Sequence, residues 1–293
     1  MNINWFPGHM AKTRRLLAEN LKLVDVVIEL LDARIPGSSK NPEIDAIIGS
    51  KPRVIAMNKA DLADEAVSRE WLKWYNKNGL SVIFIDSIKG TGINPLKAKL
   101  RELMKDRIER DKLKGRIFRP VRTMVVGIPN VGKSSFINKI AGKASAVTGD
   151  KPGVTRGKQW VRLNEEIELL DTPGILWPKF EDNQVALHLA FTGAIKDEIM
   201  DTVEIAAALL EKLSASYPAL LSGRFKLQSL ENQTGLMLLK ACGKNRGCIV
   251  SGGEIDLQRI STIVLDEFRG GKIGRITLEK PVWEVLKQDG EQG

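Results

Sequence analysis

The sequence is poor in the residues that build disulfide frameworks and zinc sites, and it lacks long apolar runs. Its only two cysteines, Cys242 and Cys248, are separated by five residues without a nearby histidine, which supports neither a disulfide framework nor a zinc site. No apolar run reaches the ~18 residues that a transmembrane helix needs. The N-terminus also lacks the apolar segment of a secretory signal. We therefore expect a soluble cytoplasmic protein with reduced thiols and no membrane partner.

Acidic residues are too few to balance the basic ones. The 293 residues include 45 Lys and Arg against 36 Asp and Glu, and the net charge of +9 favours a polyanionic partner such as RNA. Residues 97–122 hold eleven basic side chains against four acidic ones, whereas a solvated helix with i,i+4 ion pairs would be nearer balance. We interpret this segment as an RNA-backbone contact that includes Lys105, Arg107 and Arg110, with a solvated basic helix as the alternative.

Residues 127–134 form the strongest motif of the chain, G-x-x-x-x-G-K-S, which is a phosphate-binding P-loop. Its glycines let backbone N–H groups turn toward the β-phosphate, Lys133 lies along the β- and γ-oxygens, and the Ser134 hydroxyl ligates Mg²⁺. An apolar β-rich run precedes the motif and helical spacing follows it, as a strand-to-helix turn requires. The candidate nucleotide ligands here are Asn130, Val131, Gly132, Lys133, Ser134 and Ser135.

A guanine-reading element, N-K-x-D, occupies residues 58–61. The carboxylate of Asp61 can accept both the N1–H and the 2-amino proton of guanine, whereas adenine offers neither donor. Asn58 and Lys59 complete the element as candidate nucleotide ligands. The motif therefore predicts GTP and GDP as ligands, with an ATP-using P-loop enzyme that happens to carry N-K-x-D as the alternative.

A third candidate element supports the guanine base. Asp86 and Ser87 follow the predicted strand 82–85, at the position where a loop backbone usually contacts the guanine O6. The match is loose, because the usual Ser-Ala-Lys reads Asp-Ser-Ile-Lys-Gly here. We nevertheless count both residues among the predicted nucleotide ligands.

The remaining elements sense the γ-phosphate. Residues 171–174 match D-x-x-G, in which Asp171 holds a Mg²⁺-bound water and the Gly174 N–H meets the γ-phosphate. Residues 151–157 form a glycine-flanked segment in which Thr155 is the natural switch threonine for Mg²⁺. The predicted magnesium ligands are therefore Ser134, Thr155 and Asp171.

The order of the motifs is inverted, because N-K-x-D comes about seventy residues before the P-loop, which leads in an ordinary small GTPase. We expect strands at 26–31, 53–57, 82–85, 123–126, 159–163 and 167–170, and helices at 63–77, 94–114 and 133–141. This pattern predicts an α/β fold, namely a circularly permuted P-loop GTPase domain with a doubly wound, mostly parallel sheet. Each motif follows the carboxyl end of a strand, where such sheets bind ligands, so the permutation leaves the site intact.

The chain beyond residue 178 has a helical pattern. Apolar residues recur at three- and four-residue spacing in 184–190, 202–214 and 257–268, and the pairs 217–218 and 222–223 interrupt them as turns. We interpret His188, which has apolar neighbours, as a core or interface histidine rather than a catalytic one. Residues 1–178 are thus the expected GTPase domain, and 179–293 a mainly α-helical domain that we expect to dock on RNA.

The permutation has a mechanical consequence. The loop that senses the γ-phosphate runs directly into the helical domain, so we expect nucleotide state to be transmitted there. Two basic, glycine-containing stretches of that domain, 240–246 and 269–275, are candidate RNA contacts, with plain turn formation as the alternative.

The motif order resembles a known family. Together with Trp-Phe-Pro-Gly-His-Met at 5–10 and Leu-Asp-Ala-Arg-Ile-Pro at 31–36, it is similar to the YlqF/RbgA family of circularly permuted ribosome-assembly GTPases along the whole chain. The resemblance implies a GTPase that acts in late assembly of the large (50S) ribosomal subunit. It also implies binding of ribosomal RNA and of the subunit precursor, so that residues 179–293 would dock on RNA or the ribosome. The implied ligands are GTP or GDP with Mg²⁺, and the implied hydrolysis is slow and stimulated by the ribosome. We expect a monomer.

Catalysis departs from the commonest GTPase plan, because Ile175 follows Gly174 where many GTPases place a water-orienting Gln. Isoleucine has no hydrogen-bonding group, so another element must complete the site formed by Lys133 and Thr155. One candidate is His9, and the other is K⁺ held by Asn130 as a fixed charge. A nucleotide-gated RNA-binding chaperone, in which hydrolysis is incidental, is the alternative function.

Overall fold

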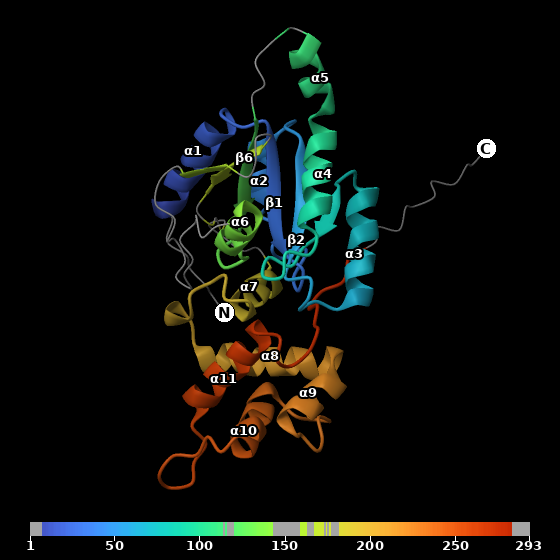
Figure 1. Ribbon diagram of the computed structural model, residues 1–293. Coiled ribbons are helices and arrows are strands. Elements are labelled where there is room, and N and C mark those ends of the chain that lie inside the picture. Colours follow the sequence, from blue (N-terminus) through green and yellow to red (C-terminus); the bar gives the residue numbers. More distant parts are fainter. Residues whose placement is uncertain are drawn as a thin grey trace, which may run out of the picture.

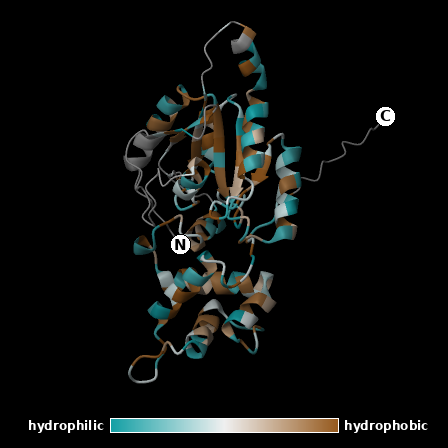
Figure 2. Cartoon of the chain, viewed as in Figure 1, coloured by the Kyte–Doolittle hydropathy of each residue, from teal (hydrophilic) through white to brown (hydrophobic). Residues whose placement is uncertain are grey.

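The computed structural model describes residues 8–113, 115, 120–142, 159–162, 167–172, 174, 176 and 182–282. The described part consists of a six-stranded sheet with flanking helices and a layer of helices beyond one end of the sheet (Figure 1). Hydrophobic residues are concentrated in the strands of the sheet (Figure 2). No helix within the described ranges is long and apolar enough to cross a membrane.

The sheet has the strand order β3-β2-β1-β4-β6-β5, and all its neighbouring strands are parallel except the pair β5 and β6. The strands are β1 (Val26–Asp32), β2 (Arg53–Asn58), β3 (Val82–Phe84), β4 (Val121–Gly127), β5 (Gln159–Arg162) and β6 (Ile167–Asp171). The chain builds from β1 outward to β3 and then crosses to the other side of β1 with β4. The strand order therefore reverses between β1 and β4, where doubly wound sheets bind ligands.

Helices cover both faces of this sheet. They are α1 (Gly8–Leu21), α2 (Pro42–Ile48), α3 (Glu65–Lys77), α4 (Ile93–Leu103), α5 (Lys105–Leu113) and α6 (Lys133–Ala141). All seven residues of β1 are buried, as expected for a strand covered on both faces. Ile28 and Leu30 pack in the cluster that includes α4 and α6, whereas Val27 packs with α1 and α2 on the opposite face.

The layer beyond the sheet is helical. It contains α7 (Asn183–Phe191), α8 (Thr202–Ser216), α9 (Pro218–Phe225), α10 (Gly235–Asn245) and α11 (Leu257–Arg269). Side-chain caps fix the starts of four of these helices, because Asp182, Asp201, Thr234 and Asp256 each accept a hydrogen bond from a first-turn N–H. Such caps satisfy backbone donors that have no partner within the helix.

The helical layer is joined to the sheet by a common core and by the chain that follows α11. One cluster of buried apolar residues extends from Leu30 of β1 to Leu265 of α11. After α11 the chain returns to the sheet side of the molecule, where the Ile276 N–H donates to Leu62 O at 2.9 Å. In the same segment the Trp71 indole N–H donates to Glu279 O at 3.0 Å. Residues 276–282 therefore pack against the GTPase-like part of the chain.

The predicted fold is confirmed, with local corrections. All six expected strands are present with ends shifted by at most two residues, and the sheet is doubly wound. The helix expected over 94–114 is instead two helices, α4 and α5, which meet at the buried Met104. Ser222 and Gly223 lie inside α9, so the turn predicted there was wrong. Residues 240–245 belong to α10 rather than to a turn, because its apolar face packs against α8.

Candidate nucleotide site

The predicted nucleotide motifs meet at the carboxyl edge of the sheet. Asp32 ends β1 and pairs with Asn58 at the end of β2, while Leu30 of β1 pairs with Gly127 at the end of β4. Asp171 ends β6, level with Val125 of β4. Parallel strands place their carboxyl ends at one edge, so motifs far apart in the chain come together there.

The P-loop has the backbone that its glycines predict. Asn130 and Gly132 have positive φ angles of 55° and 96°, and α6 begins at Lys133 directly after them. Lys133 Nζ donates to Gly127 O at 3.1 Å and to Ile128 O at 2.7 Å, so its ammonium group lies within the loop. A Cβ at Gly132 would lie 2.4 Å from Asn58 Nδ2, which makes glycine necessary at this position.

Asn58 binds three motifs together. Its Nδ2 donates to Val131 O of the P-loop at 2.8 Å across 73 residues of sequence. Its Oδ1 accepts hydrogen bonds from the Ser87 N–H at 3.2 Å and from the Ser87 hydroxyl at 2.6 Å. Both Asn58 and Ser87 are buried. The first residue of N-K-x-D thus fixes the loop of Ser87 and the P-loop relative to each other.

Lys59 makes a second link from N-K-x-D to the P-loop. Its Nζ donates to Asn130 O at 2.8 Å and lies 2.9 Å from Asp32 Oδ2. Its backbone has a φ of 59°, the left-handed region, which turns the chain sharply after β2. The Lys59 side chain therefore extends from the end of β2 to the P-loop at Asn130.

Asp86 shapes its own loop. Its Oδ1 accepts hydrogen bonds from the Ile88 N–H at 2.8 Å and the Lys89 N–H at 2.9 Å, which is the pattern of an Asx turn. The loop closes tightly, since a Cβ at Gly92 would lie 2.0 Å from Phe84 O. This arrangement holds Ser87 at its contact with Asn58, and a direct nucleotide contact by Asp86 remains a prediction.

The D-x-x-G motif comes against the P-loop. A Cβ at Gly174 would lie 2.8 Å from the Pro129 backbone and 2.9 Å from Lys133 Nζ. Thr172, one residue after β6, donates its hydroxyl to Val125 O of β4 at 2.5 Å. The close approach explains a glycine at position 174 and brings its backbone beside the lysine of the P-loop.

The other predicted ligands differ in exposure, and some lie outside the described residues. Val131 is buried, Asp61 and Ser134 are half-buried, and Ser135 is exposed. Thr155 and Ile175 fall outside the described ranges, as do the side chains of His9 and Asp171, whose backbones belong to α1 and β6. Their roles remain predictions.

The candidate RNA ligands are on α5, at the end of the sheet opposite the nucleotide site. Arg107 is ion-paired with Asp25, which immediately precedes β1 and so marks the amino edge of the sheet. The side chain of Lys105 is 71% exposed, and Arg110 is also exposed. Arg107 is therefore part of the fold. Lys105 and Arg110 are exposed and make contacts within α5, since Lys105 Nζ lies 3.9 Å from Glu109 Oε1 and Arg110 Nε donates to Asp106 O at 3.1 Å.

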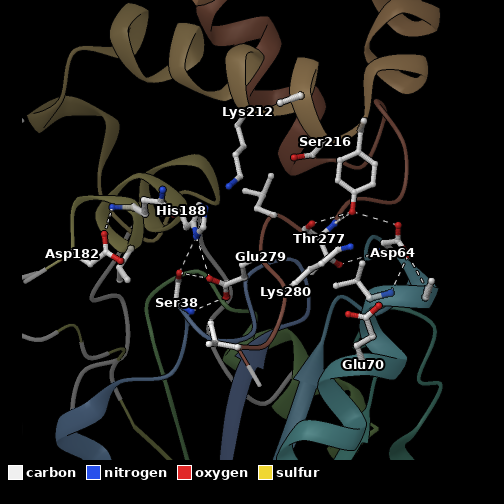
Figure 3. A pocket seen from close by; sticks show the side chains of 18 residues that line it. Ser38, Asp64, Glu70, Asp182, His188, Lys212, Ser216, Thr277, Glu279 and Lys280 are labelled. Carbon is white, nitrogen blue, oxygen red and sulfur yellow. Dashed lines mark hydrogen bonds and ion pairs between the residues drawn. The ribbon is translucent and has the colours of Figure 1, made fainter. Parts of the chain in front are cut away.

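A polar cluster at the junction of the two parts was not predicted from the sequence. Ser38 donates its hydroxyl to Glu279 Oε2 at 2.6 Å, and His188 Nδ1 lies 2.9 Å from Ser38 Oγ and 3.2 Å from Glu279 Oε2 (Figure 3). The cluster lines a cavity of about 790 Å³. A hydrolytic triad needs the histidine between nucleophile and acid, but here both contact the same ring nitrogen. His188 is thus an interface histidine, as predicted.

Three charged residues beside the site were also not predicted as part of it from the sequence. Asp32 and Arg34 are each 1% exposed and form a bidentate ion pair at the end of β1, and Arg269 of α11 binds carbonyl groups of α7. A charged residue that ends an apolar strand was the available signal for Asp32. The contacts of Arg269 depend on tertiary structure and have no local signal.

Fold and site together define the class of this protein. It has a doubly wound sheet, a P-loop at the point where the strand order reverses, and an N-K-x-D element that precedes the P-loop in the chain yet hydrogen-bonds to it. These are the features of a circularly permuted P-loop GTPase followed by a helical domain.

Comparisons with known proteins agree with this class. The model of a family described as 50S ribosome-binding GTPase matches residues 122–220, from β4 into α9. The ribosome biogenesis GTPase A of Bacillus cereus is 49% identical over 281 residues, which cover 96% of this chain and 95% of that protein. The ribosome biogenesis GTPase A of Thermotoga maritima is 31% identical, with 95% of each chain covered. This chain belongs to the ribosome biogenesis GTPase A family, and it is a GTPase of ribosome biogenesis.

A mitochondrial relative and a solved structure extend the similarity. The mouse mitochondrial ribosome-associated GTPase 1 is 32% identical, with 95% of this chain and 90% of that protein covered. The GDP-bound structure of YlqF from T. maritima superposes with a TM-score of 0.64 at 26% identity, covering 91% of this chain and 99% of that one. The fold therefore extends over both the sheet and the helical part.

Proposed function

We propose that this protein binds and hydrolyses GTP to drive a late step in assembly of the large (50S) ribosomal subunit, and that it binds ribosomal RNA in a nucleotide-dependent way. The observation that carries the proposal is the pair of hydrogen bonds from Asn58 and Lys59 to the P-loop carbonyls of Val131 and Asn130. They join a guanine reader to a phosphate cradle in one site. The name of the matching family, 50S ribosome-binding GTPase, supports the choice of subunit.

In the proposed site Asp61 reads the guanine base, Lys133 and the P-loop backbone hold the phosphates, and Gly174 meets the γ-phosphate. Hydroxyl and carboxylate oxygens are the ligands that Mg²⁺ prefers. Ser134, Thr155 and Asp171 would hold that ion, which neutralises charge on the phosphates. Ser134 fits this role, because it lies in the first turn of α6 directly after Lys133.

The element that completes catalysis is His9 or a potassium ion at Asn130. The amide of Asn130 is oriented by the hydrogen bond from its Nδ2 to Gly193 O at 2.7 Å, which leaves the amide oxygen as the cation ligand. His9 belongs to α1, and it would act when this helix places its side chain at the nucleotide edge. If either element completes the site only when a ribosomal particle is bound, hydrolysis in the free protein is slow.

Precursors of the large subunit and their ribosomal RNA are the proposed partners, and the cytoplasm is the proposed location, with the protein a monomer. Lys105 and Arg110 on α5 would contact RNA phosphates, and residues 179–293 would form the docking domain beside the GTPase domain of residues 1–178. The two surfaces lie at opposite ends of the molecule (Figure 1). The protein could therefore bridge two RNA segments.

Single-turnover GTP hydrolysis with and without large ribosomal particles tests this function. We expect slow hydrolysis by the free protein and a large increase with particles. The increase should require K⁺ if a potassium ion completes the site, and it should occur in both K⁺ and Na⁺ if His9 does. His9→Ala should keep GTP affinity and lose stimulation if His9 completes the site, because its contribution arises in the transition state. Equal stimulated rates in K⁺ and Na⁺ would exclude the potassium ion.

One result would contradict the proposal. If particles bind the GTP form of the protein but leave its hydrolysis rate unchanged, the protein is a nucleotide-gated RNA chaperone in which hydrolysis is incidental.

A further inference from the structure

The nucleotide site is connected to the helical domain by a closed ring of polar contacts. The ring begins at Lys59, whose ammonium group lies between Asn130 O of the P-loop at 2.8 Å and Asp32 Oδ2 at 2.9 Å. One lysine thus touches both the phosphate side of the site and the end of β1. Its position depends on what holds Asp32.

Asp32 is held by Arg34. The guanidinium donates from Nε to Asp32 Oδ1 at 2.9 Å and from Nη2 to Oδ2 at 2.8 Å, a bidentate pair in which each residue is 1% exposed. Burial alone would raise the pKa of Asp32, but Arg34 and Lys59 outweigh burial and hold that pKa well below its usual range. The carboxylate is therefore ionised and fully engaged.

Arg34 also crosses to the helical domain. Its Nη1 donates to Arg269 O at 3.2 Å and to Phe268 O at 3.4 Å, the last carbonyls of α11. Its guanidinium carbon lies 5.3 Å from the centroid of the Phe268 ring. The last carbonyls of a helix lack the usual i+4 partner, and an arginine from the sheet donates to two of them here, one of which, Phe268 O, also accepts the Gly271 N–H at 3.1 Å.

Arg269 repeats the same device on the next helix. It donates from Nε to Phe191 O at 3.1 Å and from Nη2 to Ala190 O at 2.9 Å, at the carboxyl end of α7. Asp197 fixes its guanidinium through two hydrogen bonds of 2.7 Å. Arg269 therefore sets the position of the turn that ends α7.

That turn closes the ring. Gly193 has a φ of 75°, and a Cβ there would lie 3.3 Å from Arg269 Nε, so the guanidinium packs directly on this residue. The carbonyl of Gly193 accepts the hydrogen bond from Asn130 Nδ2 at 2.7 Å. Asn130 is thus held from two sides, by Lys59 at its carbonyl and by Gly193 at its side chain.

We propose that Arg269 is a positioning residue for the P-loop, and that through it the helical domain forms part of the nucleotide site. Arg269 holds the turn at Gly193, whose carbonyl orients Asn130. The end of α11, to which Arg269 belongs, is in turn held by Arg34, which pairs with the same Asp32 carboxylate that Lys59 contacts. Displacement of the helical domain by a bound partner would then loosen Asn130 and Lys59 together. Because coupling between sites is reciprocal, nucleotide binding would favour one position of that domain. This inference rests on the proposed nucleotide site.

A double-mutant cycle on the full-length protein tests it. Affinities for a fluorescent GDP and a non-hydrolysable GTP analogue are measured for wild type, Arg269→Ala, Asn130→Gly and the double variant. Glycine is chosen at position 130 because the φ of 55° suits it. We expect Arg269→Ala to weaken binding about tenfold in the wild-type background and less than twofold in the Asn130→Gly background. Asp197→Asn removes only the negative charge that pairs with the Arg269 guanidinium. It should therefore also weaken nucleotide binding, but by less than Arg269→Ala does.

Arg224→Ala is the matched control. Arg224 also forms a bidentate pair, with Glu267 at 2.7 and 2.8 Å, but both residues lie within the helical domain. A merely structural effect would lower the melting temperature of both arginine variants, whereas only Arg269→Ala should change nucleotide affinity. Full additivity of Arg269→Ala with Asn130→Gly, or wild-type affinity in both Arg269→Ala and Asp197→Asn, overturns the inference. Failure of wild type to bind GTP would instead contradict the nucleotide site itself.

Discussion

Two carboxylates on the central strand illustrate how position decides ionisation. Burial raises the pKa of Glu29 to about 6, because only Arg53 faces it closely, at 3.1 Å, and Glu29 Oε1 has no hydrogen-bond partner within the described residues. Asp32, three residues further along β1, has its pKa lowered despite burial because Arg34 and Lys59 both contact it. The ionised Glu29 thus costs stability at neutral pH, whereas the ionised Asp32 is stabilised at the carboxyl edge of the sheet, beside the nucleotide motifs.

Glu29 should make stability fall as pH rises. Its folded-state pKa of about 6 is above its ordinary value of 4.5, so the folded state favours the protonated form. The contribution of Glu29 to stability is fully present below pH 4.5 and is lost as the pH rises through 6, by about 2 kcal/mol in total. Glu29→Gln should therefore unfold with a flatter pH dependence than wild type in urea titrations from pH 4.5 to 7. The exposed Glu211→Gln is the control, and parallel profiles for wild type and Glu29→Gln would refute the expectation.

Lys133 and Ser134 should be indispensable for turnover. Lys133 is the full positive charge that the P-loop directs at the phosphates, and Ser134 supplies a Mg²⁺ ligand. Lys133→Ala and Ser134→Ala should each reduce single-turnover GTP hydrolysis roughly a hundredfold or more while the fold is retained. Lys139→Ala, at the exposed far end of α6, controls for changes in the helix. Wild-type turnover in either P-loop variant would disprove the assignment.

At the scale of elements, local patterns predicted most of the fold. Apolar runs such as β1 and β2 are strands because they are buried on both faces, and the glycine-rich 127–134 turns where its motif requires. The break at Met104 could not be predicted, because helical spacing continues through it and tertiary packing of the buried methionine decides it. Nor could Ser222 and Gly223 be placed inside a helix from turn chemistry alone.

Helix α5 gives a prediction of its own. Charge counting could not tell which basic residues face solvent, and Arg107 is ion-paired with Asp25 while Lys105 and Arg110 are exposed. Reversal of both exposed residues, Lys105→Glu with Arg110→Glu, should weaken binding to large ribosomal particles and lower the salt-dependence slope by about one for each lost phosphate contact. GTP affinity should not change.

The matched control reverses the same number of charges elsewhere. Arg69→Glu with Lys73→Glu, on the exposed side of α3, should leave the salt slope as it is in wild type. An unchanged slope in the α5 variant would identify that helix as a solvated surface without an RNA contact.

At the scale of the whole molecule, sequence predicted the parts of the site but not how they are joined. The motifs, their order and the resemblance led to a permuted GTPase, and the sheet topology and the relatives confirm that class. The route to the helical domain was expected through the loop after D-x-x-G, much of which lies outside the described residues. The contacts that the structure does show run through Asn130, Gly193 and Arg269, which are 63 and more residues apart in sequence. No local pattern encodes such a contact.

The central claim is that two motifs in inverted order form one guanine-nucleotide site, and base exchange at Asp61 tests it most directly. Equilibrium titrations with GTP, ATP and xanthosine triphosphate should show wild type preferring GTP over both. Asp61→Asn should weaken GTP and gain affinity for xanthosine triphosphate, because the new amide can donate to its 2-oxo group but no longer accepts two guanine protons. GTP affinity that is the same in Asp61→Asn as in wild type, or equal binding of ATP and GTP by wild type, would contradict the account.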